Sequence, residues 1–111
     1  MRVAIPAFNG RVAPHFDFAT QLLVVTIDDR KVEEEEELSL INLNPIRRIN
    51  LLDELGVSVL ICGGISCFSE RLLASHGIDV IHMVQGKITE VIGFFINRKM
   101  DSVILPTGKK T

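Results

Sequence analysis

Beyond residue 43 the chain alternates helical patterns with short apolar runs, and this alternation is its strongest constraint on the fold. Asn44-Pro45 is typical of a helix start, and Gly56 and Gly77 follow helical patterns where helix ends are expected. The patterns predict helices over 45–55, 65–76 and 87–100, and strands over 57–61 and 78–84. Two strands joined through a helix in one sheet run parallel, with a right-handed crossover. The alternation therefore predicts an α/β fold with parallel strands.

The predicted helices each carry one apolar face, and the predicted strands between them are apolar. Strands of this kind need cover on both faces of the sheet. The side chains that we expect to face inward are Ile46, Ile49, Leu52 and Leu55 in the first helix, Ile65, Phe68, Leu72 and Leu73 in the second, and Ile88, Val91, Ile92 and Phe95 in the third.

The first 43 residues carry strand patterns instead. Residues 2–7 and 21–27 are apolar, and residues 32–42 form a hairpin with the second of these runs. The block Glu33–Glu37 suits an edge strand, because charge on an edge blocks pairing with other chains; an acidic docking surface is the alternative. The order β-β-β-α-β-α-β-α predicts a three-layer α/β/α sandwich around a mixed sheet of about five strands.

Length and composition limit the protein further. With 111 residues we expect one domain, over residues 1–100, followed by a tail over 101–111 whose Val103-Ile104-Leu105 packs or touches a neighbour. The net charge of −2 and the absence of Trp and Tyr argue against nucleic-acid binding. Two cysteines are too few for a disulfide scaffold. No apolar run has the length of a membrane span or of a signal peptide, so we expect a cytoplasmic protein.

Two segments are candidates for a binding site, since ligands of such folds lie beyond the carboxyl ends of the strands near the switch point. One is the loop after the first strand, residues 8–17, whose length is itself unusual. Its candidate ligand-binding side chains are Asn9, Arg11, which suits an anion, and His15, which suits a metal. A surface histidine in a turn is the alternative for His15.

The other segment is the turn Cys62-Gly63-Gly64-Ile65-Ser66-Cys67. Gly63 and Gly64 allow close approach of a ligand to the backbone, and Ser66 and Cys67 lie at a helix start, where N–H groups favour anions. A thiol there can have a lowered pKa and bind a soft metal or cluster. Cys62 as a small buried side chain, or a disulfide, are the alternatives. Two thiolates are fewer than an ordinary iron–sulfur site uses.

Other motifs are weaker. His76 lies in the last turn of a predicted helix, where a cation is favourable. His82 lies late in a predicted strand. It is either part of the ligand site or a histidine packed within the strand. The chain lacks the glycine motifs of nucleotide sites, and Ser66 lacks the G-x-S-x-G context of a hydrolase.

Several segments in order resemble one family: the opening RVAIPAFNG, Pro14-His15-Phe16 with Phe18-Ala19, Asn44-Pro45, GVSVLICGGI and HGIDVI. The chain resembles the dinitrogenase iron–molybdenum cofactor biosynthesis proteins, which include NifX-like proteins and the C-terminal domain of NifB, over residues 1 to about 95. The resemblance implies a ribonuclease-H-like α/β/α fold. It also implies a small protein that binds or carries a metal–sulfur cluster and is not an enzyme.

The resemblance also suggests roles for particular residues. His15 matches the histidine suspected as the cluster ligand, and Asp17 replaces the usual glycine, so we expect a loop of different shape and charge. Gly63-Gly64 matches a glycine-rich turn. The placement of the two cysteines at the glycine turn, and not the resemblance, adds Cys62 and Cys67 to His15 as expected metal ligands, with Asn9, Arg11, Gly63, Gly64 and Ser66 around the cluster.

The cargo expected is an iron–molybdenum cluster or, as in the related orange protein, another metal–sulfur cluster. We expect proteins that donate or accept the cluster as partners, and a monomer or weak homodimer. The alternatives are a thiol redox module that uses Cys62 and Cys67, and a protein-interaction domain that uses Glu33–Glu37 or the tail.

Overall fold

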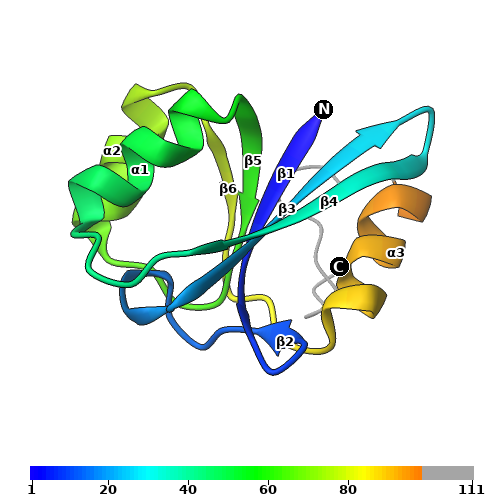
Figure 1. Ribbon diagram of the computed structural model, residues 1–111, viewed down its shortest axis with the longest axis horizontal. Helices are drawn as coiled ribbons and strands as arrows, with labels where there is room; N and C mark the ends of the chain where they lie inside the picture. The colour runs from blue at the N-terminus through cyan, green and yellow to red at the C-terminus, as the bar shows by residue number, and fades with distance from the viewer. Residues whose placement is uncertain (99–111) are drawn as a thin grey trace.

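A mixed sheet of six strands forms the centre of the computed structural model, which describes residues 1–98 (Figure 1). The predicted tail and the last two residues of the third predicted helix lie outside the described residues. The elements are β1 (Arg2–Phe8), β2 (Arg11–Val12), a 3-10 turn (Phe16–Phe18), β3 (Gln21–Asp28), β4 (Lys31–Ser39), α1 (Pro45–Glu54), β5 (Val57–Ile61), α2 (Cys67–Ser75), β6 (Asp79–Ile81) and α3 (Ile88–Arg98).

The strand order is β4-β3-β1-β5-β6, and β2 pairs with β1. β1 pairs antiparallel with β3 and parallel with β5, and β5 pairs parallel with β6. The predicted mixed α/β sheet is thus confirmed. The extra strand is β2, which the prediction placed in a loop. It follows a two-residue turn in which Asn9 and Gly10 have positive φ, the geometry that favours a tight hairpin.

Helices pack on both faces of the sheet (Figure 1). α1 and α2 cover one face through Ile49, Leu52 and Leu73, and α3 covers the other through Ile88, Val91 and Phe95. Alternate residues of β3 enter these two cores, so that this strand is buried on both sides. None of the helices in residues 1–98 is both long and apolar enough to span a membrane.

Two of the predicted inward side chains are exposed. Ile46 is 51% exposed and Phe68 is 55% exposed, whereas Arg48 and Ser69 are buried. Side chains three apart drift around a helix of 3.6 residues per turn, so Ile46 and Leu55 cannot share a face. In α2, which begins at Cys67, the buried side chains are Ser69 and Leu73, which lie four positions apart on one face of the helix, and Phe68 lies outside this face.

Two predicted strands are shorter than expected. β4 ends at Ser39, and its five glutamates are exposed at the edge of the sheet, as predicted. β6 ends at Ile81, so His82 lies beyond the strand with a side chain that is 48% exposed. The prediction of a packed strand histidine at His82 is therefore wrong.

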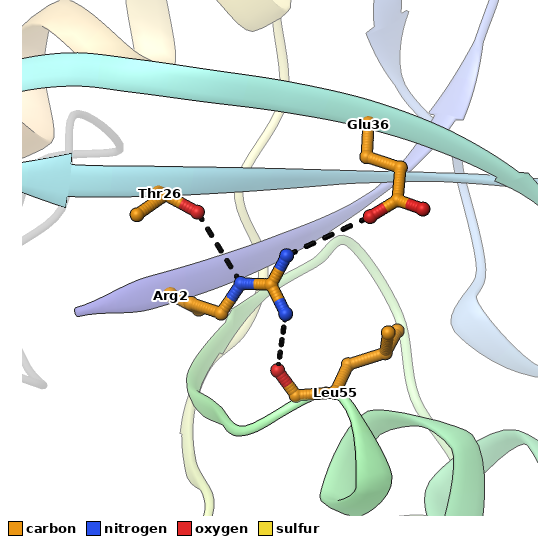
Figure 2. Close-up of polar contacts among 4 residues, drawn as sticks. All are labelled: Arg2, Thr26, Glu36 and Leu55. Carbon is orange, nitrogen blue, oxygen red and sulfur yellow. Dashed lines mark hydrogen bonds and ion pairs between the residues drawn. The ribbon is translucent and has the colours of Figure 1, made fainter.

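Arg2, the first residue of β1, joins this strand to the carboxyl end of α1 (Figure 2). Its Nε donates to Thr26 Oγ1 at 3.2 Å, and one terminal nitrogen donates to the Leu55 carbonyl at 2.6 Å. The other terminal nitrogen lies 3.6 Å from the Glu36 carboxylate on β4. A cation at the carboxyl end of a helix satisfies a free carbonyl and interacts favourably with the helix dipole.

Candidate functional site

The two segments that the sequence singled out lie against each other. The Gly64 N–H donates to the Pro14 carbonyl at 2.8 Å, and the Phe16 N–H donates to the Gly64 carbonyl at 2.8 Å. The loop after β6 joins them, because the Met83 N–H donates to the Gly63 carbonyl and the Val12 N–H to the Gly86 carbonyl, both at 2.9 Å. Three loops therefore meet at the carboxyl ends of β1, β5 and β6.

This position is the switch point of the sheet. β1 and β5 are neighbours, and the chain leaves β1 toward β3 but leaves β5 toward β6, on the opposite side. Connections that diverge in this way leave a crevice beyond the strand ends. The predicted placement of the site at this edge agrees with the geometry.

Gly63 and Gly64 are needed for the close contact between the loops. A Cβ at Gly63 would lie 2.7 Å from the Pro14 carbonyl oxygen and 2.9 Å from that of Ala13. A Cβ at Gly64 would lie 2.9 Å from His15 Cδ2. All three distances are shorter than real Cβ contacts, so these glycines serve packing between loops as well as any approach of a ligand.

Two hollows open on either side of the Ala13-Pro14 segment. The first hollow has a volume of about 470 Å³ and the second about 290 Å³. The first is lined by Arg11, Val12, Ala13, Pro14, Gly63, Gly64, Met83, Val84, Gln85 and Gly86. The second is lined by Ala7, Phe8, Ala13, Pro14, His15, Phe18, Ala19 and Thr20.

The charge around both hollows favours an anion. Arg11 is the one residue with a fixed charge among the described residues that line them, and no carboxylate lines either. The N–H groups of Gly63, Gln85 and Gly86 have no hydrogen-bond partner among residues 1–98. Met83, at the rim of the first hollow, has a φ of 66° and is 61% exposed. A non-glycine residue in the left-handed region is strained, which is common at functional sites.

The Asp17 carboxylate lines neither hollow. Ser69 Oγ donates to Asp17 Oδ2 at 3.3 Å, which holds this carboxylate against the first turn of α2. Its Oδ1 is buried and has no hydrogen-bond partner in the described part of the chain. The negative charge expected to disturb the loop is therefore accommodated beside a helix N-terminus, where the helix dipole favours it.

His15 caps the 3-10 turn and lines the second hollow. Its Nδ1 accepts a hydrogen bond from the Asp17 N–H at 3.2 Å, and its ring lies 5.1 Å from the Phe18 ring, centre to centre. The Phe18 ring is 80% exposed, and Phe8 at the other wall is 58% exposed. The hollow thus has mostly apolar walls, and the polar side chains among its described lining residues are those of Thr20 and of His15, which the backbone holds in place.

Arg48 on α1, which no sequence pattern indicated as a site residue, holds this turn through hydrogen bonds to its backbone. Its buried guanidinium donates to the carbonyls of Phe16 at 2.8 Å, Ala19 at 2.6 Å, Leu43 at 2.8 Å and Leu40 at 3.3 Å. Burial lowers the pKa of Arg48, and the nearby charge of Asp17 partly opposes this. The only signal in the sequence is an arginine beside Ile49 on the inner face of an otherwise amphipathic helix.

The cysteines do not join His15. Cys62 is fully buried in the core under α1 and α2, and burial, with smaller contributions from Glu70 and Asp17, raises the pKa of its thiol to about 12. Cys67 is exposed as the first residue of α2, and both thiols are free. A protonated, buried thiol is a poor metal ligand. Within residues 1–98, no three His, Cys, Asp or Glu side chains come together to hold a metal. The expected ligand set of His15, Cys62 and Cys67 is not assembled.

The remaining candidates have structural roles. Ser66 caps α2, since its Oγ accepts from the Ser69 N–H at 3.1 Å, and Asn9 forms the β1–β2 turn; neither lines a hollow. His76 pairs with Asp53 at 2.8 Å and so joins α2 to α1. His82 Nε2 lies 3.7 Å from Glu70. Arg11, His15, Gly63 and Gly64 are the predicted site residues that line the hollows.

Comparison with known proteins agrees with this architecture. A solved structure, that of PH0822, matches with a TM-score of 0.84 and 29% identity over 88% of this chain and 90% of that one. The apo form of the orange protein from Desulfovibrio gigas matches with a TM-score of 0.72 and 23% identity over 88% of each chain. MJ0580 of Methanocaldococcus jannaschii is 24% identical over 91% of this chain and 90% of its own length.

A family model covers the whole described part of the chain. The model described as "Dinitrogenase iron-molybdenum cofactor" matches residues 1–98, which include every strand, every helix and both hollows. This match agrees with the resemblance carried by the short sequence segments, since these lie on β1, the 3-10 turn, α1, β5 and β6. The chain belongs to the dinitrogenase iron–molybdenum cofactor family.

Proposed function

We propose that this protein is a non-catalytic carrier of an anionic metal–sulfur cluster, of the iron–molybdenum type or a related one. The cargo lies at the switch point of the sheet, against Pro14, with Arg11 on one side and His15 on the other. The observation that carries the proposal is the chemistry of the two hollows: among the described residues that line them, most are apolar, one has a fixed positive charge and none is a carboxylate.

A cluster of this kind carries negative charge on sulfur or oxygen atoms, which accept hydrogen bonds. The guanidinium of Arg11 presents several N–H donors to such an anion, and charge-assisted hydrogen bonds are about twice as strong as neutral ones. Phe8 and Phe18 shield the cargo from water. Since residues 1–98 bring no three metal ligands together, they hold the cargo loosely enough to pass it on, as a carrier requires.

A carrier of this kind exchanges its cargo with other proteins. We therefore expect donor and acceptor proteins to approach the edge on which Phe8, Phe18 and Met83 are exposed. Such partners belong to the cytoplasm, where free thiols persist. A monomer or weak homodimer leaves this edge accessible to them.

Anaerobic reconstitution with iron, sulfide and molybdate tests the proposal. Because the chain has no Trp and no Tyr, a bound cluster dominates the absorption spectrum. We expect coloured protein that retains molybdenum or iron after desalting. Arg11→Met should weaken binding about tenfold or more, while Arg47→Met, at an exposed position on α1, serves as the matched control.

Two results would contradict the proposal. One is a colourless protein without metal after reconstitution. The other is equal loading of the Arg11→Met and Arg47→Met variants, which would place the cargo away from the hollows.

The thiol redox alternative gains no support from the fold. Cys62 is buried with a pKa of about 12, so its thiolate is scarce at neutral pH. The interaction alternative keeps one specific observation, the exposed glutamates of β4. A partner bound through this edge would be lost on Glu35→Lys and retained on Arg11→Met.

A further inference from the structure

The hydrogen bonding of His15 determines which of its ring nitrogens has a free lone pair. The Asp17 N–H points at Nδ1, and a backbone N–H only donates. Nδ1 must therefore accept with its lone pair, and the neutral ring carries its proton on Nε2. Neither nitrogen then offers the lone pair that coordination of a metal requires.

From this geometry we infer that His15 contacts the cargo as a hydrogen-bond donor through Nε2, and not as a metal ligand. The inference rests on the proposed function, because it concerns the same cargo. It is also consistent with the finding that, in the described part of the chain, no three His, Cys, Asp or Glu side chains come together to hold a metal.

Coordination through Nε2 would require the proton to move to Nδ1. The Asp17 N–H would then face another N–H, and the 3-10 turn would lose its cap. The opposite ring orientation would place a carbon against the Asp17 N–H and lose the same bond. The ring is also confined, because Phe18 lies beside it and Cδ2 faces the Gly64 backbone.

The donor at Nε2 has no hydrogen-bond partner among residues 1–98. His15 lines the second hollow, where among the described lining residues Thr20 is the only other one with a polar side chain and the rest are apolar. With Arg11, the protein thus offers two donors on the two sides of Pro14. The ligand class that fits is a thio- or oxo-anion of a metal whose coordination is already complete, bound through its outer sulfur or oxygen atoms.

The tautomer of His15 in the unloaded protein is the first test. Long-range proton–nitrogen correlation spectra distinguish a protonated Nε2 from a protonated Nδ1. We expect the His15 proton on Nε2. A proton on Nδ1 would overturn the inference, and this measurement depends on no variant.

The second test uses tetrathiomolybdate as the probe, titrated anaerobically and followed by its absorption. His15→Gln keeps an N–H donor near the position of Nε2, whereas His15→Cys supplies a soft metal ligand without that donor. We expect His15→Gln to bind within about threefold of the unmodified protein, and His15→Cys and His15→Ala to bind about tenfold more weakly.

The outcomes separate the two proposals. If the unmodified protein binds no tetrathiomolybdate, the proposed function fails and the inference fails with it. If it binds, but His15→Gln is as weak as His15→Ala while His15→Cys retains binding, the carrier function stands and the donor role of His15 is wrong.

Discussion

The backbone of Gly64 lies directly against the imidazole ring of His15, so that a methyl group at Gly64 would come within 2.9 Å of His15 Cδ2. The contact joins the loop after β1 to the loop after β5. For Gly63, next to it, the three atoms nearest to an added Cβ are all backbone atoms, which belong to the carbonyl groups of Ala13 and Pro14. The two glycines therefore differ in what a substitution would displace.

Gly63→Ala should destabilise the protein strongly, by roughly 1–3 kcal/mol, because a backbone carbonyl cannot move aside as a side chain can. Gly64→Ala should cost less stability and instead displace the His15 ring. Urea unfolding measures the first effect, and a changed His15 ring resonance measures the second.

Gly93→Ala is the matched control for both. Gly93 lies within α3 with nothing within 4 Å of its missing Cβ, so alanine there should stabilise the helix by about 0.5–1 kcal/mol. A Gly63→Ala variant as stable as the unmodified protein would contradict the close packing of the two loops.

Arg48 supports the site at a distance. Arg48→Met removes the donors to four carbonyls, three of them in buried hydrogen bonds, so we expect a loss of roughly 3–5 kcal/mol. Arg48→Lys keeps the charge but cannot span these carbonyls, so it should recover only a part of the loss. Denaturant unfolding gives the stability, and faster amide hydrogen exchange at Ala19 would report the loosened turn. Full stability of Arg48→Lys would show that charge alone suffices.

The sequence predicted those parts of the fold that local pattern specifies. Asn44 caps α1 as expected, with its side chain accepting from the Arg47 N–H at 2.9 Å, and the apolar run of β5 has the predicted limits. The edge of the sheet that holds the site also follows from strand order alone, since β1 and β5 end there.

The features that the prediction missed depend on contacts between distant residues. Arg48 reaches Phe16 and Ala19, which are 32 and 29 positions away in the chain. The sequence left a small buried Cys62 open as an alternative to a ligand role, and its burial follows from the packing of α1 and α2, not from its place beside a glycine turn. The position of a cysteine in the sequence can place it near the edge of the sheet where ligands bind. It does not determine which face of the sheet the thiol packs against.

Cys62 makes stability depend on pH in the alkaline range. Its pKa rises from 9.0 to about 12 on folding, so above pH 9 the unfolded chain has lost a proton that the folded protein keeps. The free energy of unfolding then falls as pH rises, by up to about 1.4 kcal/mol per pH unit from this group. Below pH 9 both states are protonated and the contribution is fully present.

Urea midpoints between about pH 8 and about pH 10.5 measure this slope. Cys62→Ala lacks the thiol and should show a smaller decline, although it is less stable at each pH because of the cavity it leaves. Cys67 is present in both proteins, so any contribution of its thiol to the pH dependence cancels in the comparison. Equal slopes would show that the Cys62 thiol ionises as readily in the folded protein as in the unfolded chain.

Variants of Arg2 and Glu36 distinguish what a surface ion pair contributes to stability from what a hydrogen bond to the end of α1 contributes. Its contact with Glu36 is long, at 3.6 Å, and the Glu36 side chain is 52% exposed, so Glu36→Gln should change stability by no more than about 0.5 kcal/mol. Arg2→Met also removes the 2.6 Å bond to the Leu55 carbonyl and the bond to Thr26, so we expect a loss of about 1–2 kcal/mol.

Raising the salt concentration should reduce the small effect of Glu36→Gln and leave most of the Arg2→Met effect, because exposed charges are screened and a partly buried hydrogen bond is not. If both variants lost equal stability, the ion pair with β4, and not the bond to the end of α1, would be the main contribution of Arg2.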